Sequence, residues 1–359
     1  MKKLSTYGVK YAGSKLKMIP HIVSLILELR DVKHVLDGFS GTTRVSQAFA
    51  QLGYNTTASD LSIWSDVFAH CFLKSSQTDS FYQEIINHLN SLKGYDGWYT
   101  EHYGSEASES KKPFQSKNTR KLDAIRDEIE TLDLSWVDKS VILTSLILAL
   151  DKVDSTLGHY VAYLSKWSPR SHKDLLLKLP NRFPTNYQNH HVVRGDIFET
   201  VTKNEYDLAY FDPPYGSNND KMPTSRVRYA SYYHLWTTII NHDKPKLFGK
   251  ANRREDTRDV VATSIFEEFR KNKDGAFIAM SALDKLIQST NSKYILLSYS
   301  SGGRATKEEL NNIINTSGKL LKAIEIDYKK NVMSNMRWTN DWINSDGKYV
   351  EYLFLMKKY

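Results

Sequence analysis

An acid, two prolines and a tyrosine follow directly after a run of strand-forming residues in the second half of this chain. Tyr206 to Phe211 is rich in strand formers, and Asp212-Pro213-Pro214-Tyr215 comes next. Proline fixes φ and lacks an amide hydrogen, so a strand cannot continue through the pair. We therefore predict that Asp212 and Tyr215 are held rigidly at the carboxyl edge of a strand, where open α/β sheets bind their ligands.

The four residues of this turn have the groups needed to hold an aromatic amine. The carboxylate of Asp212 and the carbonyl of Pro213 are two acceptors that can bind both hydrogens of an exocyclic NH₂, while Tyr215 stacks on the ring. The amine nitrogen can then attack an activated methyl group in line. Orientation and electrostatics suffice for this reaction, so we expect no metal and no covalent enzyme intermediate. A base inside a duplex must be flipped out to reach such a pocket.

Length, charge and cysteine content narrow the class of protein. A chain of 359 residues exceeds the usual single core, so we expect one large domain with an insertion, or two domains. Its formal net charge of +8 is compatible with a polyanionic partner. The single cysteine, Cys71, excludes a disulfide within the chain and is expected to be buried. No signal core follows the basic start, and the longest apolar run, Val141 to Leu150, is too short to span a bilayer, so we expect a soluble, cytoplasmic protein.

A glycine turn between a strand and a helix can hold a nucleotide-like ligand. Val32 to Asp37 is expected to be a strand, and it leads through Gly38-Phe39-Ser40-Gly41-Thr42-Thr43 into a helix from Arg44 to Leu52. No dinucleotide fingerprint and no Walker lysine can be aligned here. A second expected strand, Tyr54 to Ala58, ends in Ser59-Asp60, and an acid at this place usually holds a ribose diol.

Two further stretches can complete that ligand site. Near the amino terminus Ala12-Gly13-Ser14 predicts a turn, with Ser14 capping an amphipathic helix that runs to about Leu29. Tyr11 offers a flat face and Lys15 a cation beside this turn, which suits an adenine ring and a carboxylate. Much later, a short strand at His191 to Asp196 ends in an acid followed by Ile197 and Phe198, which can clasp an adenine.

The region from Phe68 to about His190 differs from the rest of the chain. It is expected to be mostly helical, with polar connections at Lys93 to Gly104 and Ser105 to Ser116. Its loops mix aromatic and basic residues, a composition that suits phosphate contact and base stacking. We therefore predict a catalytic domain at 1–75 and 190–359 and an inserted helical target-recognition domain at 76–189. The expected helices of this region are Phe81 to Leu92, Lys117 to Leu132 and Trp136 to Lys152.

Basic loops follow the Asp-Pro-Pro-Tyr turn, and after them the chain again alternates between expected strands and helices. Lys221 to Arg228 and Lys244 to Arg258 flank an expected helix, Tyr232 to Asn241, and are predicted to stay mobile until a polyanion orders them. A third basic loop lies at Lys329 to Asp346. The other expected elements are strands at Gly275 to Ser281, Tyr294 to Ser300, Lys319 to Asp327 and Tyr349 to Met356, with helices at Ala282 to Gln288 and Lys307 to Ile314.

Together these motifs resemble the Dam-like, alpha-class DNA N6-adenine methyltransferases of restriction-modification systems. The matching motifs are Tyr11 to Lys15, Asp37 to Thr43, Ser59-Asp60, Gly195 to Phe198, Asp212 to Tyr215, Asp151 to Gly158 and Leu297 to Gly303. The resemblance implies a Rossmann-like, seven-stranded, mainly parallel sheet with one reversed strand, and S-adenosylmethionine as methyl donor. It also implies base flipping and sequence-specific methylation of adenine N6 in double-stranded DNA. Thr43 departs from the family pattern, which usually has a glycine there.

The resemblance and the loop compositions assign three groups of candidate residues, with no metal ligand among them. The catalytic group is Asp212, Pro213, Pro214 and Tyr215. The cofactor group is Tyr7, Tyr11, Ser14, Lys15, Asp37, Phe39, Ser40, Gly41, Thr42, Thr43, Asp60, Leu61, Asp196, Ile197 and Phe198. The DNA-binding group is Lys111, Lys112, Lys166, Arg170, Lys221, Arg226, Arg228, Lys250, Arg253, Arg254, Tyr299, Lys330 and Arg337.

Several other functions are compatible with these motifs. Cytosine-N4 methylation uses the same geometry but more often has serine at position 212, and methylation of RNA or of a protein amide more often has asparagine. A DNA-binding module without turnover is the alternative from another class, and the intact Asp212 to Tyr215 motif argues against it. The expected partners are double-stranded DNA and, as a candidate, a cognate restriction endonuclease, with no membrane. We expect a monomer or weak dimer in the bacterial or phage-associated nucleoid.

Overall fold

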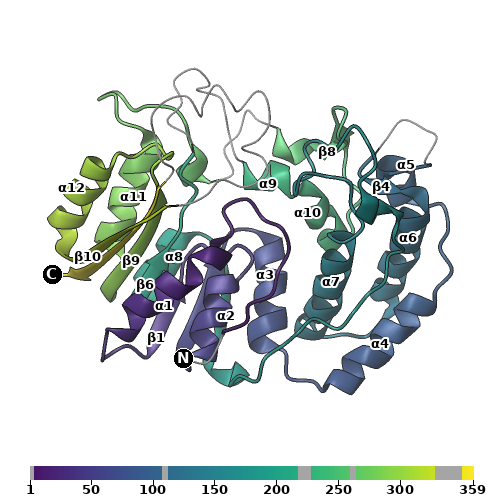
Figure 1. Cartoon of the computed structure of the whole chain (residues 1–359), viewed down its shortest axis with the longest axis horizontal. Coiled ribbons are helices and arrows are strands. Elements are labelled where there is room, and N and C mark those ends of the chain that lie inside the picture. The colour runs from purple at the N-terminus through teal and green to yellow at the C-terminus, as the bar shows by residue number, and fades with distance from the viewer. Residues whose placement is uncertain (1–3, 107–111, 217–227, 259–263, 328–349) are drawn as a thin grey trace. The chain divides into compact units, whose positions relative to one another are not determined.

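The computed structural model describes residues 4–106, 112–216, 228–258, 264–327 and 350–359 (Figure 1). In these residues one mixed seven-stranded sheet has the order β10-β11-β9-β6-β1-β2-β5. Strand β11 runs antiparallel to both β9 and β10, whereas β6 is parallel to β1 and β9, and β2 is parallel to β5. The α/β class and the mainly parallel sheet with a reversed strand are therefore confirmed. The strands are β1 (His34–Asp37), β2 (Asn55–Asp60), β5 (His191–Arg194), β6 (Tyr206–Phe211), β9 (Ser292–Ser300), β10 (Gly318–Asp327) and β11 (Val350–Lys358).

The chain divides into two compact units. The first unit comprises Met1–Ile19, Ser40–Arg194 and Tyr229–Val261, and the second comprises Pro20–Phe39, Gly195–Arg228 and Ala262–Tyr359. The helices of the first are α2 (Arg44–Gln51), α3 (Ile63–Ala69), α4 (Asp79–Ser91), α5 (Trp98–Tyr103), α6 (Ser116–Thr131), α7 (Trp136–Leu150), α9 (Tyr229–Tyr232) and α10 (His234–Asn241). Those of the second are α1 (Ile19–Leu27), α8 (Ile197–Lys203), α11 (Ile278–Ser289) and α12 (Lys307–Ser317).

Short elements complete the description. A π-helical turn, η2 (His70–Lys74), follows α3, and two-stranded ribbons are formed by β3 (Gly104–Ser105) with β4 (Phe114–Gln115) and by β7 (Leu247–Phe248) with β8 (Arg253–Arg254). The 3₁₀ turns are η1 (Lys15–Lys17), η3 (Pro169–His172), η4 (Tyr187–Asn189), η5 (Glu255–Thr257) and η6 (Ile265–Glu267). None of the helices in the described part of the chain is long and apolar enough to cross a membrane.

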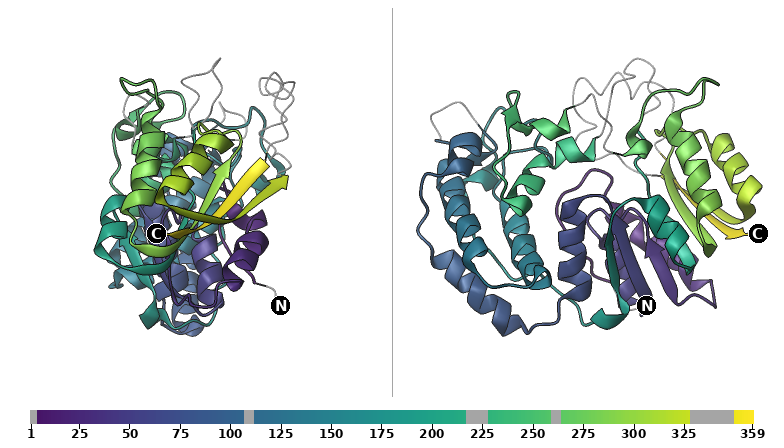
Figure 2. Two further views of the ribbon diagram at one scale, coloured as in Figure 1. Left: turned by 90° about the vertical axis from the view of Figure 1, so that its left-hand side faces the viewer. Right: turned by 180° about the vertical axis from the view of Figure 1, so that it is seen from behind.

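The core of the second unit lies between the sheet and helices α8, α11 and α12. Alternate strand residues such as Phe211 on β6, Leu297 on β9 and Phe354 on β11 share this core, because successive side chains of a strand point to opposite faces. Figure 2 shows α11 and α12 on one side of these strands and α1 on the other. This covering by helices explains why β6 is buried along nearly its whole length.

The strand expected at Gly275 to Ser281 is wrong, because the segment leads into helix α11, which begins at Ile278. The buried residues of α11 include Ala279, Leu283 and Leu286, whose spacing is helical. A short apolar run such as 276–280 cannot be assigned to strand or helix from periodicity alone, and here the tertiary packing decides for the helix. The helix expected at Ala282 to Gln288 is the remainder of this same element.

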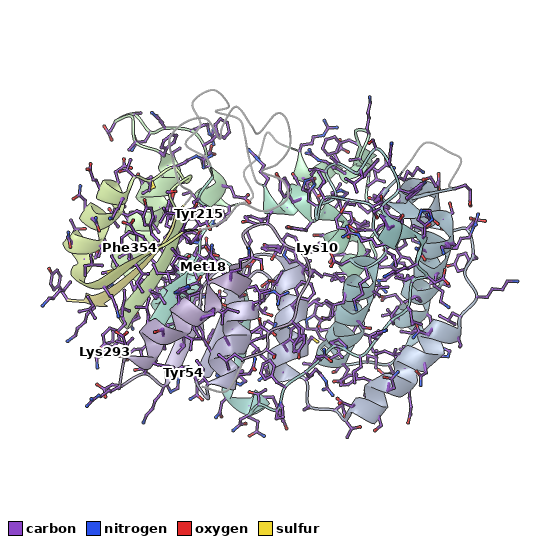
Figure 3. All side chains as sticks on the ribbon, viewed as in Figure 1. Lys10, Met18, Tyr54, Tyr215, Lys293 and Phe354 are labelled. Atoms are coloured by element: carbon purple, nitrogen blue, oxygen red, sulfur yellow. The ribbon has the colours of Figure 1, made fainter. Side chains whose placement is uncertain are left out.

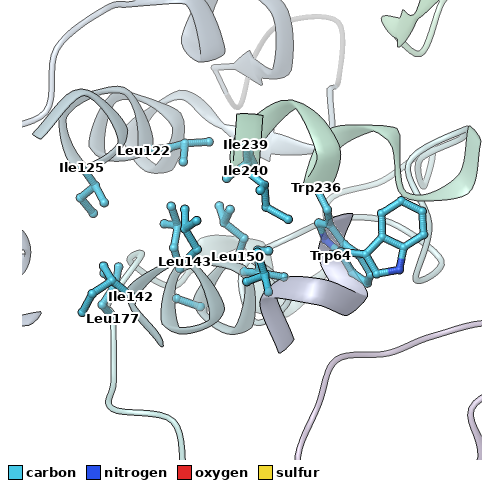
Figure 4. Close-up of a cluster of buried hydrophobic side chains, with 14 of the residues drawn as sticks. Trp64, Leu122, Ile125, Ile142, Leu143, Leu150, Leu177, Trp236, Ile239 and Ile240 are labelled. Atoms are coloured by element: carbon cyan, nitrogen blue, oxygen red, sulfur yellow. The ribbon is translucent and has the colours of Figure 1, made fainter. Parts of the chain in front are cut away.

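The first unit is built around a separate apolar core, shown in Figure 4. Helix α7 is buried on almost every side, which matches its uniformly apolar sequence. It packs with Trp64 of α3 and with Trp236 and Ile239 of α10, which lie outside 76–189. The helices of 76–189 thus share their core with neighbouring segments of the unit, and Cys71 is buried in it as expected.

Two segments expected to be irregular are ordered. Helix α5 occupies 98–103, inside the stretch expected as a polar connection, and the carboxylate of Asp123 accepts hydrogen bonds from the amides of Tyr99 and Thr100 in its first turn. Residues 244–258 include the β7–β8 hairpin, in which Phe248 lies beneath the guanidinium groups of Arg253 and Arg258. Residues 244–258, expected as a basic loop, thus contain a short hairpin, while most of 221–228 and all of 329–346 lie outside the described residues.

Candidate functional site

The Asp-Pro-Pro-Tyr turn lies where the sequence predicts it, directly after β6. The strand ends at Phe211, and the amide of Gly38 donates to the carbonyl of Tyr210 at 2.9 Å, so the turn after β1 begins beside the end of β6. Asp37, the last residue of β1, is 1% exposed. Carboxyl ends of parallel strands meet at one edge of a sheet, and here they bring Asp37 and the Asp212–Tyr215 turn to the same edge.

Tyr215 is fixed by contacts from three other segments of the second unit. Its carbonyl accepts a hydrogen bond from the amide of Arg304 at 3.0 Å. Its hydroxyl donates to Oε1 of Glu351 at 3.1 Å, and its ring lies 5.0 Å from the ring of Tyr299. The residue nevertheless stays partly exposed, and Figure 3 labels it near the ends of the strands of this unit. A partly exposed ring with a fixed position can serve as a stacking platform.

An aromatic cluster surrounds the predicted adenine clasp of the second unit. Phe39 meets Phe266 edge to face at 5.0 Å and Phe211 at 6.2 Å, and Phe198 stacks on Phe266 at 5.9 Å. The carboxylate of Asp196 caps helix α8 by accepting from the amide of Phe198 at 2.9 Å, while the side chain itself is exposed. The cap explains why an acid stands at this strand end on structural grounds alone.

In the first unit the glycine turn and the predicted ribose acid are joined directly. The amide of Gly41 donates to Oδ2 of Asp60 at 2.8 Å, and Oδ1 accepts from the amide and hydroxyl of Ser62. Gly41 has a φ of 48°, and a Cβ there would come within 3.3 Å of the Tyr11 ring, so glycine fits this position with the least strain. Burial raises the pKa of Asp60, although the hydrogen bonds from Ser62 and Gly41 oppose that shift. The exposed Leu61 follows at once.

Thr43, which departs from the family pattern, adopts the left-handed conformation that glycine would occupy easily. Its φ is 60° and its ψ 15°, and its side chain is fully buried. A β-branched residue in this region costs roughly 1–3 kcal/mol. The fold compensates through the Thr43 hydroxyl, which accepts a hydrogen bond from Gln47 at 3.2 Å. Gln47 in turn makes two hydrogen bonds to the backbone of Tyr7.

Tyr11 belongs to a stack of aromatic rings within the first unit. Its ring lies 4.7 Å from Tyr233 and 5.3 Å from Tyr229, and Tyr233 stacks on Trp236 at 4.2 Å. The Tyr233 hydroxyl also accepts from the amide of Ala12 at 2.7 Å. Helices α9 and α10 therefore hold the amino-terminal motif in place.

Two expectations for the amino-terminal segment are wrong. Ser14 precedes the 3₁₀ turn η1, but its side chain makes no capping hydrogen bond. The expected continuous helix is divided into η1 and α1, because Pro20 lacks the amide hydrogen needed to extend a preceding turn. Lys15, the predicted cation of this motif, is 7% exposed.

The predicted DNA-binding residues differ in accessibility. Lys166 and Lys250 are exposed, and the hydroxyl of Tyr163 donates to the Lys250 carbonyl at 2.5 Å, so the two lysine loops lie together in the first unit.

Other predicted DNA-binding residues make contacts within the protein. Arg170 pairs with Asp154, and Arg254 with Asp243 and Asp256, which gives both arginines a structural role. Arg228 and Tyr299 are each 3% exposed. The amine of Lys112 donates to the carbonyl of Glu101, and Arg253 donates to that of Thr257. Lys111, Lys221, Arg226, Lys330 and Arg337 lie outside the described residues.

Three residues that contact the predicted site were not found from the sequence. Glu351 and Arg304 lie in later elements, and their contacts depend on strand pairing that no local pattern reveals. Tyr233 is different, because Tyr229, Tyr233 and Trp236 recur at a spacing of four and three residues that places them on one helix face. This spacing could have predicted an aromatic stack from the sequence.

A mixed seven-stranded sheet with an Asp-Pro-Pro-Tyr turn at the carboxyl end of β6 is the arrangement expected of an S-adenosylmethionine-dependent methyltransferase. Residues 11–263 match the model of the D12 class N6 adenine-specific DNA methyltransferases, and the chain belongs to that family. It is 30% identical to the modification methylase StsI of Streptococcus sanguinis over 328 residues, which is 85% of this chain but only 46% of that protein. It is 25% identical to the type II methyltransferase M.NlaIII of Neisseria lactamica over 358 residues, covering 98% of this chain and 99% of that protein.

A third relative repeats the pattern of partial coverage. The type II methyltransferase M.FokI of Planomicrobium okeanokoites is 26% identical over 344 residues, or 90% of this chain and 49% of that protein. This chain therefore spans about half the length of two of these relatives and nearly all of M.NlaIII. Family membership implies S-adenosylmethionine as the methyl donor.

The residues of the glycine turn suit that donor. Asp60 presents carboxylate acceptors of the kind that hold ribose hydroxyls, and the exposed Leu61 beside it offers an apolar surface. Gly41 leaves the backbone of the turn uncovered by a side chain, which permits close approach of a ligand. In the second unit, Phe39 and Phe198 contribute flat apolar groups around Phe266. The first unit thus offers a carboxylate beside an uncovered backbone turn, a combination that suits a nucleoside.

Proposed function

We propose that this protein transfers a methyl group to N6 of an adenine that is flipped out of double-stranded DNA at a specific sequence. The observation that carries the proposal is the position of Asp212–Tyr215 at the carboxyl end of β6, with Tyr215 fixed at its hydroxyl and its backbone, in a chain of the D12 family. The turn offers acceptors for an amine and a ring for stacking. A flipped adenine presents both of the complementary features.

The turn residues have separate tasks in this proposal. The Asp212 carboxylate and the Pro213 carbonyl accept the two hydrogens of the adenine N6 amine and draw its lone pair out of conjugation. Tyr215 stacks on the base and holds its plane. Bound S-adenosylmethionine would supply the methyl group, while the protein provides orientation and electrostatic stabilisation.

The cofactor assignment is part of the same proposal. Asp60 holds the ribose, the 38–43 turn lies against the donor, and Tyr11 and Lys15 offer a flat face to its adenine and a cation to its carboxylate. Asp37 and the segment 196–198 complete the assigned group. The hydrogen bond between Gly41 and Asp60 supports this grouping, because it joins the glycine turn directly to the acid that is assigned to the ribose.

We infer that the exposed lysines of the first unit bind the DNA backbone. Lys166 and Lys250 are accessible, and the Tyr163 contact keeps their loops together. Segment 76–189 remains our proposal for the target-recognition region, although its helices share a core with α3 and α10. We propose action at a bacterial or phage-associated nucleoid as a monomer or weak dimer, with a cognate restriction endonuclease as a candidate partner.

Expression in a bacterial host that lacks DNA methylation tests the proposal. Single-molecule sequencing of the host DNA then reports which bases are modified and in which sequence. The proposal requires N6-methyladenine at one recurrent site. Methylation of cytosine N4, or unmodified DNA in the presence of soluble protein, would contradict it and favour the alternatives of cytosine methylation or a module without turnover.

A further inference from the structure

A buried acid, Glu351, lies at the same edge of the sheet as the Asp-Pro-Pro-Tyr turn. It is the second residue of β11, and its Cα is paired with that of Ser300 on β9. The residue is 6% exposed. Acidic side chains are seldom buried unless polar partners compensate for the lost hydration, so the partners of Glu351 indicate why it is there.

The partners of Glu351 include the tyrosine of the turn. Oε1 of Glu351 accepts a hydrogen bond from the Tyr215 hydroxyl at 3.1 Å and a second one from Oγ of Ser298 at 3.0 Å. Ser298 is fully buried on the neighbouring strand, two residues before the position paired with Glu351. Diagonal neighbours on paired strands lie on the same face, so the serine can hold the carboxyl in one orientation.

Other contacts hold the backbone and the base of the Tyr215 side chain, whereas the hydrogen bond to Glu351 acts at its hydroxyl end. The Arg304 amide holds the Tyr215 carbonyl, and a Cβ at Gly303 would come within 2.9 Å of the Tyr215 Cβ. These contacts fix the backbone and the base of the side chain. The Tyr299 ring touches one side at an interplanar angle of 56°, which does not orient the far end of the phenol. The hydrogen bond to Glu351 acts at that far end.

We propose that Glu351, oriented by Ser298, is a positioning residue that fixes where the hydroxyl end of the Tyr215 ring lies, and so holds the ring in place for stacking on the flipped base. The inference rests on the proposed function, because it assigns Tyr215 its stacking role. Glu351 touches neither base nor methyl donor in this proposal and acts only through the tyrosine. Loss of its hydrogen bond leaves the Tyr215 backbone in place but removes the contact that holds the hydroxyl end of the ring.

A double-mutant cycle with Tyr215→Phe and Glu351→Ala tests the proposal. The readouts are kcat for methyl transfer and the fluorescence of DNA carrying 2-aminopurine at the target base. We expect Glu351→Ala alone to lower kcat about 10- to 100-fold and to reduce the fluorescence gain, since hydrogen bonds to charged groups have effects of this size. In the Tyr215→Phe background the hydroxyl is gone, and Glu351→Ala should then change kcat less than about threefold. Glu351→Gln retains an acceptor oxygen and should fall between wild type and Glu351→Ala.

Controls separate positioning from general damage to the fold. Glu325 is an exposed acid on the adjacent strand β10, and Glu325→Ala should leave kcat and fluorescence within about twofold of wild type. The affinity for S-adenosylmethionine, measured by calorimetry, should be unchanged in every variant. Independent effects of the two substitutions would overturn the inference, as would equal loss of donor affinity in Glu351→Ala and Glu351→Gln. A wild-type protein that neither methylates nor flips adenine would overturn the proposed function together with this inference.

Discussion

The side-chain amide of Gln47 donates a hydrogen bond from Nε2 to the hydroxyl of Thr43 across one turn at the start of α2, over 3.2 Å. This contact supports a residue in a left-handed conformation that is unfavourable for threonine. It also links the 38–43 turn to Tyr7, whose backbone Gln47 holds at two points. A departure from the family pattern is thus accommodated by a side-chain network.

Replacing Thr43 separates backbone strain from this network. Thr43→Gly relieves the strain but loses the hydrogen bond, so we expect its free energy of unfolding to stay within about 1 kcal/mol of wild type. Thr43→Ala loses the hydrogen bond while the positive φ remains, and it should be about 1–2 kcal/mol less stable than the glycine variant. Urea titration measures both. Equal stability of the two variants would mean that φ at this position carries no strain.

Tyr233 should stabilise the amino-terminal motif through its hydroxyl. Tyr233→Phe keeps the ring stack and removes the acceptor for the Ala12 amide, so we expect a loss of about 1 kcal/mol in stability and roughly fivefold weaker donor binding. Thermal unfolding and calorimetry with S-adenosylmethionine measure the two effects. Tyr187→Phe, at an exposed tyrosine, is the matched control and should change neither. Unchanged binding of S-adenosylmethionine by Tyr233→Phe would show that the Tyr233 hydroxyl does not support donor binding through the amino-terminal motif.

Asp151 should make stability depend on pH. Burial raises the pKa of this carboxyl to about 7 from a reference of 3.8, against the opposing effects of Lys152 and Arg44. Between these values the unfolded chain has lost the proton while the folded protein keeps it, so stability should fall as the pH rises from about 4 to 7. The predicted size is on the order of 4 kcal/mol, and Asp151→Asn should remove this part of the dependence.

Urea titrations at several pH values check the Asp151 prediction. The unfolding free energies of wild type and Asp151→Asn should diverge across this window, with the variant relatively more stable at pH 8 than at pH 5. Asp174→Asn, which alters an exposed carboxyl, serves as control. Parallel pH curves for wild type and Asp151→Asn would show that the carboxyl is not buried in solution as it is in this structure.

Lys166 and Lys250 should contribute to the salt dependence of DNA binding. Each phosphate contact steepens the slope of log K against log salt by about 0.9, so the double alanine variant should lower the slope by roughly 2. Fluorescence anisotropy at several salt concentrations measures it. Lys203 is an exposed lysine of α8 in the second unit, and Lys203→Ala should leave the slope as it is. An unchanged slope in the double variant would exclude both lysines from the phosphate contacts.

The elements predicted best from the sequence are those with local signals. Tyr206–Phe211 is a strand of the predicted extent because strand formers precede two prolines, and the strand–turn–helix unit around Gly41 follows from composition. The short β7–β8 hairpin was missed even though Gly249 and Asn252, both at positive φ, stand in its turn. These two residue types were the signal for a turn.

Other features depend on tertiary contacts and could not be predicted from the sequence. The start of α5 is capped by Asp123 from α6, more than twenty residues away in sequence. Glu351 reaches Tyr215 only because β11 is inserted between β9 and β10. The apolar run before Ala282 reads equally well as strand or helix until its packing against the sheet is known.

The most direct test of the proposed chemistry is methyl transfer by the Asp212→Ala variant. Transfer of labelled methyl from S-adenosylmethionine to DNA containing the mapped site should fall by about 10²- to 10³-fold or more, because an acceptor of the N6 amine is lost. DNA affinity should stay within about threefold of wild type, since Asp212 does not contact the backbone in this account. Transfer at near wild-type rates by a folded Asp212→Ala protein would contradict the central role of the Asp-Pro-Pro-Tyr turn.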